Sequence, residues 1–363
     1  MNVLVLKDFD YELPRELIAA FPPSERPSAR LLSVARQSGK FSHYVFRDMI
    51  EFLKPGDVLV LNNTKVIPAR LFGKKTTGGK VEALLLREKE ACQWQTLLRP
   101  GGRIKKGAEL SFGENGIRIS AKVLDDPKPD SGERLLGFEG EPAQIKETLR
   151  HIGHIPLPPY IDRPDSSADR ELYQTVFAAQ EGAVASPTAG LHFDWPLLKQ
   201  IEKKGIEIVF ITLHTSYGTF QPITEREIFR RQLFAEPFEI TDAAAERMNR
   251  ARAEKRRIIA CGTTTVRALE SAAVREGEVR AQTGETRLFI YPPYSFKMAQ
   301  GIITNFHLPK SSLLMLVAAF LDTAACPSPK GSHGGLPLLL KIYKEAIRNQ
   351  YRFYSYGDAM MIL

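Results

Sequence analysis

The feature that most limits the fold of this chain is a run of short predicted strands in its first half. From Val58 to about Phe138, apolar and β-branched segments recur, and turn sequences such as Thr77-Gly78-Gly79 and Pro100-Gly101-Gly102 separate them. A helical period is almost absent from this stretch. Short strands at a spacing of about ten residues are typical of a small antiparallel β-barrel.

The second half of the chain alternates helices with apolar strands. A helix that begins after Asp194 and ends at Gly205 leads into an apolar run over 206–213. A second helix leads into Ile258-Ile259-Ala260-Cys261, and a third begins at Val266, after the turn over 262–265. Strands that are apolar on both faces and alternate with helices predict an α/β domain.

The chain length fits two domains of this kind. The 363 residues correspond to about two domains of typical size. Residues 1–57 also mix helix and strand, as the second half does. We therefore predict an α/β domain formed by 1–57 and 150–363, with a small antiparallel β-barrel inserted over 58–149.

Composition excludes several classes of protein. With 43% hydrophobic and 25% charged residues, the chain is neither disordered nor fibrous. Cys92, Cys261 and Cys326 are far apart and form no Cys-x-x-Cys pair, so we expect neither disulfides nor a cysteine zinc site. The first residues lack the basic segment of a signal peptide. The longest apolar run, 313–321, is shorter than the about 20 residues of a membrane span. We expect a cytoplasmic protein without a membrane partner.

The chain carries an excess of positive charge. Lysine and arginine exceed aspartate and glutamate by eight. A phosphate-rich partner would explain this excess because basic patches release counterions from nucleic acid, and solubility alone would explain it as well. Basic residues crowd the predicted barrel, among them Arg99 and Lys105. Basic residues also recur on a predicted helix over 247–257, but a charged helix face of this kind is more often simply exposed to solvent than bound to a partner.

Several common catalytic motifs are absent. The chain has no Gly-x-Gly-x-x-Gly, no Walker A loop, no His-Glu-x-x-His and no Gly-x-Ser-x-Gly. Hydride transfer, nucleotide hydrolysis, zinc proteolysis and lipase-like chemistry are therefore disfavoured. What remains is a set of polar loops just beyond predicted strands or at the starts of predicted helices.

The clearest of these loops is Gly262-Thr263-Thr264, between a strand and a helix. Glycine allows close approach of the backbone, hydroxyls donate hydrogen bonds, and a helix start offers free N–H groups. Ligands of open α/β sheets bind beyond the carboxyl ends of the strands. The alternative is a helix start that serves only structure.

Three histidines stand in similar loops. His192 follows Thr188 and Gly190, His214 closes the apolar strand, and His307 precedes a helix. An imidazole titrates near neutrality and suits proton transfer, although a lone histidine beside apolar residues is more often structural. The three could also bind a metal, but no carboxylate lies at ligand spacing, so we expect no metal.

Two further segments are rich in proline or aromatic residues. The run over 153–161 is stiff because of its prolines, and it either shapes a groove or links the domains. The run over 351–360 contains four aromatic residues and Asp358. Aromatic faces suit base stacking or a sulfonium cation, although packing is their usual role at a C-terminus.

Together these segments resemble a known family. The matching motifs are Asp8-Phe9-Asp10-Tyr11-Glu12-Leu13-Pro14, Gly56-Asp57 through Ala69-Arg70-Leu71, the proline run at His154, Tyr173-Gln174-Thr175-Val176, Pro187 to Phe193, Gly262-Thr263-Thr264, Thr304 to Ser311, and the Tyr-Gly-Asp-Ala-Met ending. They resemble the S-adenosylmethionine:tRNA ribosyltransferase-isomerase family of queuosine biosynthesis, and they run nearly from end to end.

The resemblance implies an α/β domain with an inserted β-barrel and a specific reaction. The ribosyl part of S-adenosylmethionine is transferred to 7-aminomethyl-7-deazaguanine at the wobble position of tRNA and isomerised. Epoxyqueuosine forms, and adenine and methionine are released. S-adenosylmethionine is then a consumed substrate, and we expect no cofactor. We also expect the enzyme to be a monomer.

The resemblance also suggests roles for the loop residues. We expect His192 and His307, and next His214, to transfer protons. For binding S-adenosylmethionine we expect Thr188, Gly190, Gly262, Thr263, Thr264 and Asp358. For binding tRNA we expect Arg70, Arg99, Lys105 and Lys310.

The chain departs from the family pattern at three places. It has Asn62-Asn63-Thr64-Lys65 where the family usually has Asn-Asp-Thr-Arg. It has Leu233-Phe234-Ala235-Glu236 where the family has Met-His-x-Glu, and Thr215-Ser216-Tyr217 where the family has smaller apolar residues and glycine. Two alternatives stay open beside this activity, a non-catalytic RNA-binding protein and an S-adenosylmethionine-dependent RNA methyltransferase.

Overall fold

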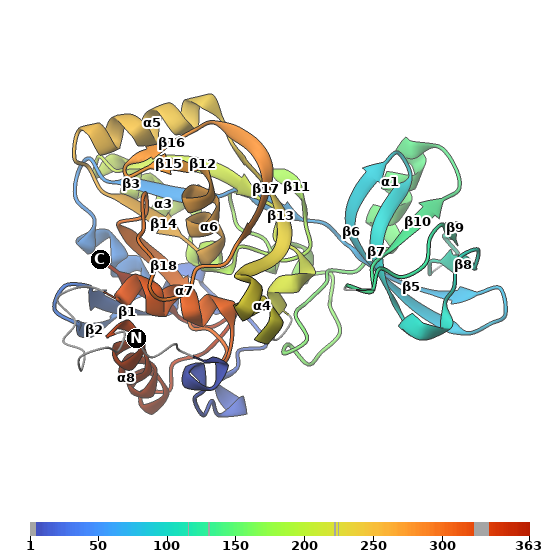
Figure 1. The fold of residues 1–363 in the computed structure, drawn as a ribbon, viewed down its shortest axis with the longest axis horizontal. Helices are drawn as coiled ribbons and strands as arrows, with labels where there is room; N and C mark the ends of the chain where they lie inside the picture. Colours follow the sequence, from blue (N-terminus) through green and yellow to red (C-terminus); the bar gives the residue numbers. More distant parts are fainter. Residues whose placement is uncertain (1–4, 115, 130, 221–222, 224, 323–333) are drawn as a thin grey trace.

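The chain folds into an α/β domain and a closed six-stranded β-barrel, as the sequence predicts (Figure 1). This computed structural model describes residues 5–114, 116–129, 131–220, 223, 225–322 and 334–363. The barrel lies to one side of the α/β domain, and the C-terminus lies in the α/β domain (Figure 1).

A nine-stranded sheet forms the centre of the α/β domain. Its order is β17 (Gln282–Leu288), β13 (Gln232–Ile240), β12 (Glu207–Leu213), β3 (Val58–Asn62), β14 (Ile258–Cys261), β18 (Gly301–Asn305), β19 (Ala359–Ile362), β1 (Arg30–Ala35) and β2 (Lys40–Val45).

Four neighbouring strands of this sheet run in the same direction. β3 pairs in parallel with β12 and with β14, and β14 pairs in parallel with β18. The flanking strands β13 and β19 are antiparallel to them. The carboxyl ends of β12, β3, β14 and β18 therefore meet at one edge of the sheet.

Helices cover both faces of the sheet. On β3, Val58 and Val60 belong to the same apolar cluster as residues of α5 (Asp242–Ala253), α6 (Thr263–Ala272), α7 (Ser312–Leu321) and α8 (Gly335–Arg348). Leu59 and Leu61 face the other way and pack with residues of α3 (Trp195–Lys203) and η4 (Phe46–Phe52). Alternate residues of a strand point to opposite faces, so a strand covered on both sides must be apolar throughout.

The barrel consists of six antiparallel strands. They are β5 (Arg70–Lys75), β6 (Lys80–Glu90), β7 (Gln93–Arg99), β8 (Glu109–Phe112), β9 (Ile119–Val123) and β10 (Arg134–Phe138), and pairing of β9 with β10 closes the barrel. α1 (Pro142–Ile152) packs against it through Ile145, Leu149 and Ile152.

One predicted barrel strand lies elsewhere. We expected the barrel from residue 58, but Val58–Asn62 is β3, at the centre of the nine-stranded sheet. All five of its residues are buried, because both faces of this strand are covered. The next strand, β4 (Thr64–Val66), pairs with β11 (Gln180–Ala183) and is also outside the barrel. The assignment of Val58–Leu61 to the barrel was therefore wrong, and barrel pairing begins at Arg70.

The remaining elements are short. They are α2 (Asp169–Leu172), α4 (Glu225–Arg230), β15 (Ala273–Arg275), β16 (Glu278–Val279), and the 3₁₀ helices η1 (Leu6–Phe9), η2 (Arg15–Leu17), η3 (Arg26–Ser28), η5 (Gly101–Arg103), η6 (Thr188–His192) and η7 (Tyr217–Phe220). Within the described ranges, no helix has the length and apolar character needed to cross a bilayer.

Candidate functional site

Polar residues gather where the four parallel strands end. Asn62 lies at the end of β3, and its side chain binds the end of β12. Its Nδ2 donates to the Leu213 carbonyl at 3.0 Å, and its Oδ1 accepts from the Leu213 amide at 3.0 Å. The Asn62 Nδ2 also lies 3.5 Å from Thr264 Oγ1, just beyond β14. This edge is where ligands of parallel α/β sheets bind.

A small cavity of about 70 Å³ opens at this edge. Its walls come from the start of α6, the loop before η6, the loop after β18 and the aromatic C-terminal segment. The polar residues and the glycine that line it include Tyr160, Ser186, Thr188, Thr215, Gly262, Thr263, Thr264, Asn305, His307, Tyr354 and Ser355.

A larger cavity of about 770 Å³ lies between this edge and the barrel. From the α/β domain, His214, Thr215, Tyr217 and Phe234 line it, and from the barrel side come β6 and β7 residues including Trp94. Thr215 lines both cavities, so they adjoin at that residue.

His214 is the histidine that faces the large cavity. Its Nδ1 lies 2.7 Å from Thr64 Oγ1, and its Nε2 makes no hydrogen bond to any residue that the structure describes. Burial and then the nearby Arg87 guanidinium lower the pKa of His214 below its usual value. The imidazole is therefore neutral near pH 7, and Nε2 is the ring nitrogen that Thr64 does not engage.

His307 faces the small cavity. Its Nε2 lies 2.7 Å from Thr304 Oγ1, its amide donates to the Tyr343 hydroxyl at 2.9 Å, and its carbonyl accepts from Tyr11. Burial lowers the pKa of His307 to about 3. A neutral ring in this position can exchange hydrogen bonds with a ligand.

His192 lies behind the cavity wall. It is buried against Phe46, with ring centroids 4.9 Å apart, and it lines neither cavity. Burial, followed by Arg352 and Arg26, lowers the pKa of His192 to about 3. Its Nε2 lies 3.2 Å from Asn305 Nδ2, and Asn305 Oδ1 accepts from Thr188 at 2.9 Å. Among the described residues, Asn305 is the hydrogen-bond partner that links His192 to the small cavity.

The sequence matches the family described as queuosine biosynthesis protein over residues 6–362. The chain belongs to this family. It is 45% identical over 359 residues to the S-adenosylmethionine:tRNA ribosyltransferase-isomerase of Desulforamulus reducens, which covers 99% of each chain. It is 44% identical over 358 residues to the protein of the same name from Clostridioides difficile, which covers 98% of this chain and 99% of the other.

A solved structure agrees with this membership. The crystal structure of the S-adenosylmethionine tRNA ribosyltransferase from Thermotoga maritima is 36% identical in sequence and has a TM-score of 0.54. The match covers 98% of this chain and 100% of that chain. The α/β domain with an inserted barrel, predicted above from the strand and helix pattern, is thus confirmed as a fold of the family.

Most of the predicted donor-binding residues of this family member lie at the small cavity. Thr188, Gly262, Thr263 and Thr264 all line it. Gly190 does not line the cavity. A Cβ at this position would come within 2.9 Å of Phe177 Cζ and Thr175 Cγ2. This glycine allows tight packing inside the protein rather than contact with a ligand.

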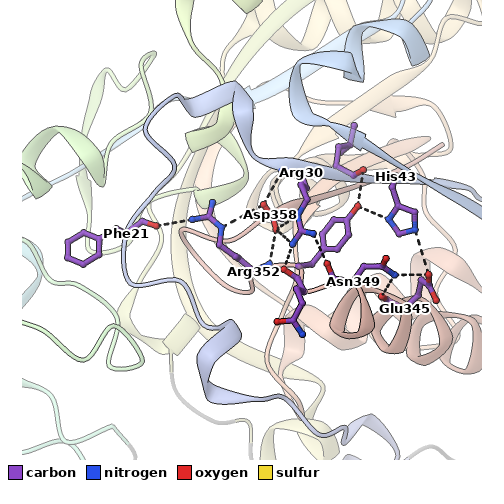
Figure 2. Close-up of polar contacts among 10 residues, drawn as sticks. Phe21, Arg30, His43, Glu345, Asn349, Arg352 and Asp358 are labelled. Atoms are coloured by element: carbon purple, nitrogen blue, oxygen red, sulfur yellow. Dashed lines mark hydrogen bonds and ion pairs between the residues drawn. The ribbon is translucent and has the colours of Figure 1, made fainter.

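Asp358 lies away from both cavities. Figure 2 shows its carboxylate between Arg30 and Arg352. The amides of Arg30 and Arg352 donate to it at 2.9 and 2.7 Å, and the Arg30 guanidinium lies 3.2 Å away. The carboxylate is 2% exposed. The structure therefore does not bring Asp358 to the site, and it instead holds the segment that carries Tyr354 and Ser355 into the small cavity.

Three of the four predicted tRNA-binding residues are already engaged. Arg70 pairs with Glu82 at 3.3 Å, and Lys310 pairs with Asp10 at 2.6 Å. Arg99 donates to the Tyr217 hydroxyl at 3.0 Å and so connects the barrel to the loop after β12. Lys105 is exposed on the barrel.

The positions that depart from the family pattern are accommodated in the structure. Asn63 Oδ1 accepts from Thr212 Oγ1 at 2.7 Å, so the side-chain amide at this position supplies the acceptor for that hydrogen bond. Phe234 lines the large cavity and packs on Gly218, where a Cβ would come within 2.4 Å of its ring. Glu236, which the chain shares with the family pattern, is buried in an ion pair with Arg267.

Several lining residues were not assigned from the sequence. Ser186, Thr215 and Tyr354 line the small cavity, and their hydroxyls are buried without a hydrogen-bond partner among the described residues. Tyr160 stacks on Tyr354 with ring centroids 4.3 Å apart, and its hydroxyl lies 2.6 Å from Ser355 Oγ. Their positions in stiff or aromatic loops beside matched motifs were the available signal.

Proposed function

We propose that this chain transfers the ribosyl part of S-adenosylmethionine to 7-aminomethyl-7-deazaguanine at the wobble position of tRNA and isomerises it. Epoxyqueuosine is formed, and adenine and methionine are released. The full-length similarity to ribosyltransferase-isomerases supports this activity. The observation that carries the assignment of the site is the large cavity at the strand ends, with the neutral His214 in its wall.

The sizes of the two cavities support different roles in substrate binding. Sites for ligands of drug size measure about 300–1,000 Å³. The cavity of about 770 Å³ is large enough for the reacting parts of both substrates, whereas the cavity of about 70 Å³ accepts only one end of the donor. The ribose and the wobble base meet in the large cavity.

His214 is the base that removes the proton beside the sulfonium. Loss of that proton and of adenine activates the ribosyl group, the aminomethyl nitrogen of the base attacks it, and methionine leaves as the epoxide closes. The sulfonium is a reactive leaving group, so no nucleotide hydrolysis is needed. His307 forms hydrogen bonds with the donor, and His192 orients Asn305.

The substrates and surroundings follow from this activity. S-adenosylmethionine is consumed and no resident cofactor takes part. The tRNA phosphates bind to exposed cations of the barrel such as Lys105, because phosphate contacts supply most of the affinity for nucleic acid. The enzyme acts as a monomer in the cytoplasm, where its tRNA substrate is made.

Product analysis tests the proposed reaction. The purified protein is mixed with S-adenosylmethionine and tRNA that carries the aminomethyl base, and adenine and the mass of the tRNA are measured. We expect free adenine in step with a mass gain on the tRNA. S-adenosylhomocysteine would indicate a methyltransferase, and tRNA binding without any product would indicate a non-catalytic binder.

A further inference from the structure

We propose that the small cavity binds the carboxylate of an amino acid, namely the methionine end of S-adenosylmethionine. This inference rests on the proposed function for the identity of the ligand. It adds which end of the donor enters the cavity and which groups hold it. The start of α6 and three buried hydroxyls form the site.

The first observation is the uncapped start of α6. This helix has ten residues, and its N-cap is Gly262, which has no side chain to bind the first amides. The amides of Thr263, Thr264 and Thr265 make no hydrogen bond to any described residue. Gly262, Thr263 and Thr264 line the cavity. Free amides and the positive end of the helix dipole favour an anion at this position.

The α7 helix provides a contrast at the same cavity. Its N-cap residue Ser311 accepts from the Leu314 amide at 3.2 Å, so one of its first amides is satisfied by a side chain of the same helix start. The N-terminus of α6 differs from its neighbour in having no such side-chain cap.

The second observation is independent of the helix. The side chains of Ser186, Thr215 and Tyr354 line the cavity, are 5%, 2% and 5% exposed, and carry hydroxyls without a partner among the described residues. A buried polar group without a partner is destabilising and calls for an unseen partner. Three such donors around one cavity supply hydrogen bonds for the oxygens of a carboxylate.

The charge and size of the small cavity favour the carboxylate of the donor over its other groups. None of the described lining residues is an aspartate or glutamate, so the walls hold no anionic side chain that would repel a carboxylate. An adenine ring needs more room than about 70 Å³, whereas a carboxylate with its α-carbon fits. The sulfonium and ammonium of the donor itself offset the carboxylate charge.

Removal of these hydroxyls should affect donor affinity and protein stability differently. Ser186→Ala, Thr215→Val and Tyr354→Phe each remove a hydroxyl that has no hydrogen-bond partner among the residues that the structure describes. The melting temperature of the ligand-free protein should stay the same or rise. Affinity for S-adenosylmethionine should fall by about tenfold for each variant, because hydrogen bonds to charged groups are the strong ones.

Ser271→Ala is the matched control. Ser271 lies on α6 as well, lines neither cavity, and its hydroxyl is 2.5 Å from Thr286 Oγ1. This variant should lower the melting temperature slightly, because it breaks a hydrogen bond, and leave affinity for the donor unchanged.

Decarboxylated S-adenosylmethionine provides the direct test. Equilibrium binding of this analogue and of S-adenosylmethionine is measured for the unaltered protein and the three variants. We expect the unaltered protein to bind the carboxylated donor at least about tenfold more tightly, and each variant to reduce that ratio. Equal affinity for the two donors, no binding of either, or variants that weaken both donors equally would overturn the proposal.

The binding measurement can fail or succeed independently of the proposed reaction. Adenine release judges the reaction, whereas the ratio of the two binding constants judges the carboxylate site. A protein that releases adenine but binds both donors equally keeps its function and loses this inference. A protein that releases no adenine but prefers the carboxylated donor keeps the site and loses the reaction.

Discussion

At the scale of single residues, the space that each imidazole faces separates the three histidines. His214 lines the large cavity, His307 the small one, and His192 neither. The sequence placed all three in loops at strand ends, but a loop sequence does not reveal which way a side chain points. His192 precedes helix α3 and His214 follows strand β12, and only packing decides that His192 is buried against Phe46.

Replacement of His214 tests its role as the base. His214→Ala should lower kcat for adenine release by about 10²–10⁴-fold, the usual contribution of a general base. Donor binding at the small cavity should persist. His151→Ala, on the exposed face of α1, is the control and should keep full activity. Full activity of His214→Ala would remove this residue from the mechanism.

The pH profile of kcat should report the same imidazole. Burial and Arg87 lower the pKa of His214 below its usual value, so the neutral base is present at pH 7 and is lost only at more acidic pH. Arg87→Gln removes one of the two causes and should raise that pKa, which moves the acidic limb of the profile to higher pH. Lys89→Gln, at another cation of the same cavity, should leave the limb unmoved. An unmoved limb in Arg87→Gln would exclude His214 as the titrating group.

At the scale of secondary-structure elements, turns and alternation were predictable and pairing partners were not. The barrel strands after Arg70 and the helices α3 and α7 lie where their turn and capping residues place them, whereas α6 begins at Thr263 instead of the predicted Val266. β3 is the exception. It follows a turn and precedes the barrel in sequence, but its partners are β12 and β14, which come more than a hundred residues later. Its unbroken apolar run was the available sign that both faces are covered.

β11 controls the position of His214. A Cβ on Gly182 would come within 3.0 Å of the His214 ring, and the φ angle of Gly182 is 149°. Gly182→Ala should therefore displace the imidazole and lower kcat by roughly tenfold, because small displacements of catalytic groups lower the reaction rate strongly. Gly79→Ala, in an open turn of the barrel, is the control. Unchanged kcat in Gly182→Ala would mean that the ring position is not critical.

At the scale of the whole molecule, the barrel forms part of the site as well as a surface for tRNA. Arg87 of β6 pairs with Glu285 of β17, and Arg99 of β7 binds Tyr217 of the loop after β12. The sequence indicated an insertion, and it could not show that the insertion closes the cavity at the strand ends. That arrangement depends on contacts between segments far apart in the chain.

Salt dependence should identify the barrel cations that contact tRNA. The slope of log Kd against log salt is set by the number of phosphate contacts, and each lost contact lowers it by about one. Lys105→Ala should reduce the slope by about that amount. Lys344→Ala on α8, on the side of the molecule away from the barrel (Figure 1), should leave it unchanged. Equal slopes for both variants would place the tRNA elsewhere.

A crystal structure of the protein with a non-reactive S-adenosylmethionine analogue would locate both ends of the donor. We expect the ribose of the analogue in the large cavity, within hydrogen-bonding reach of His214 Nε2, and its methionine end at the start of α6. An analogue bound away from the carboxyl ends of β12, β3, β14 and β18 would rule out this edge of the sheet as the active site.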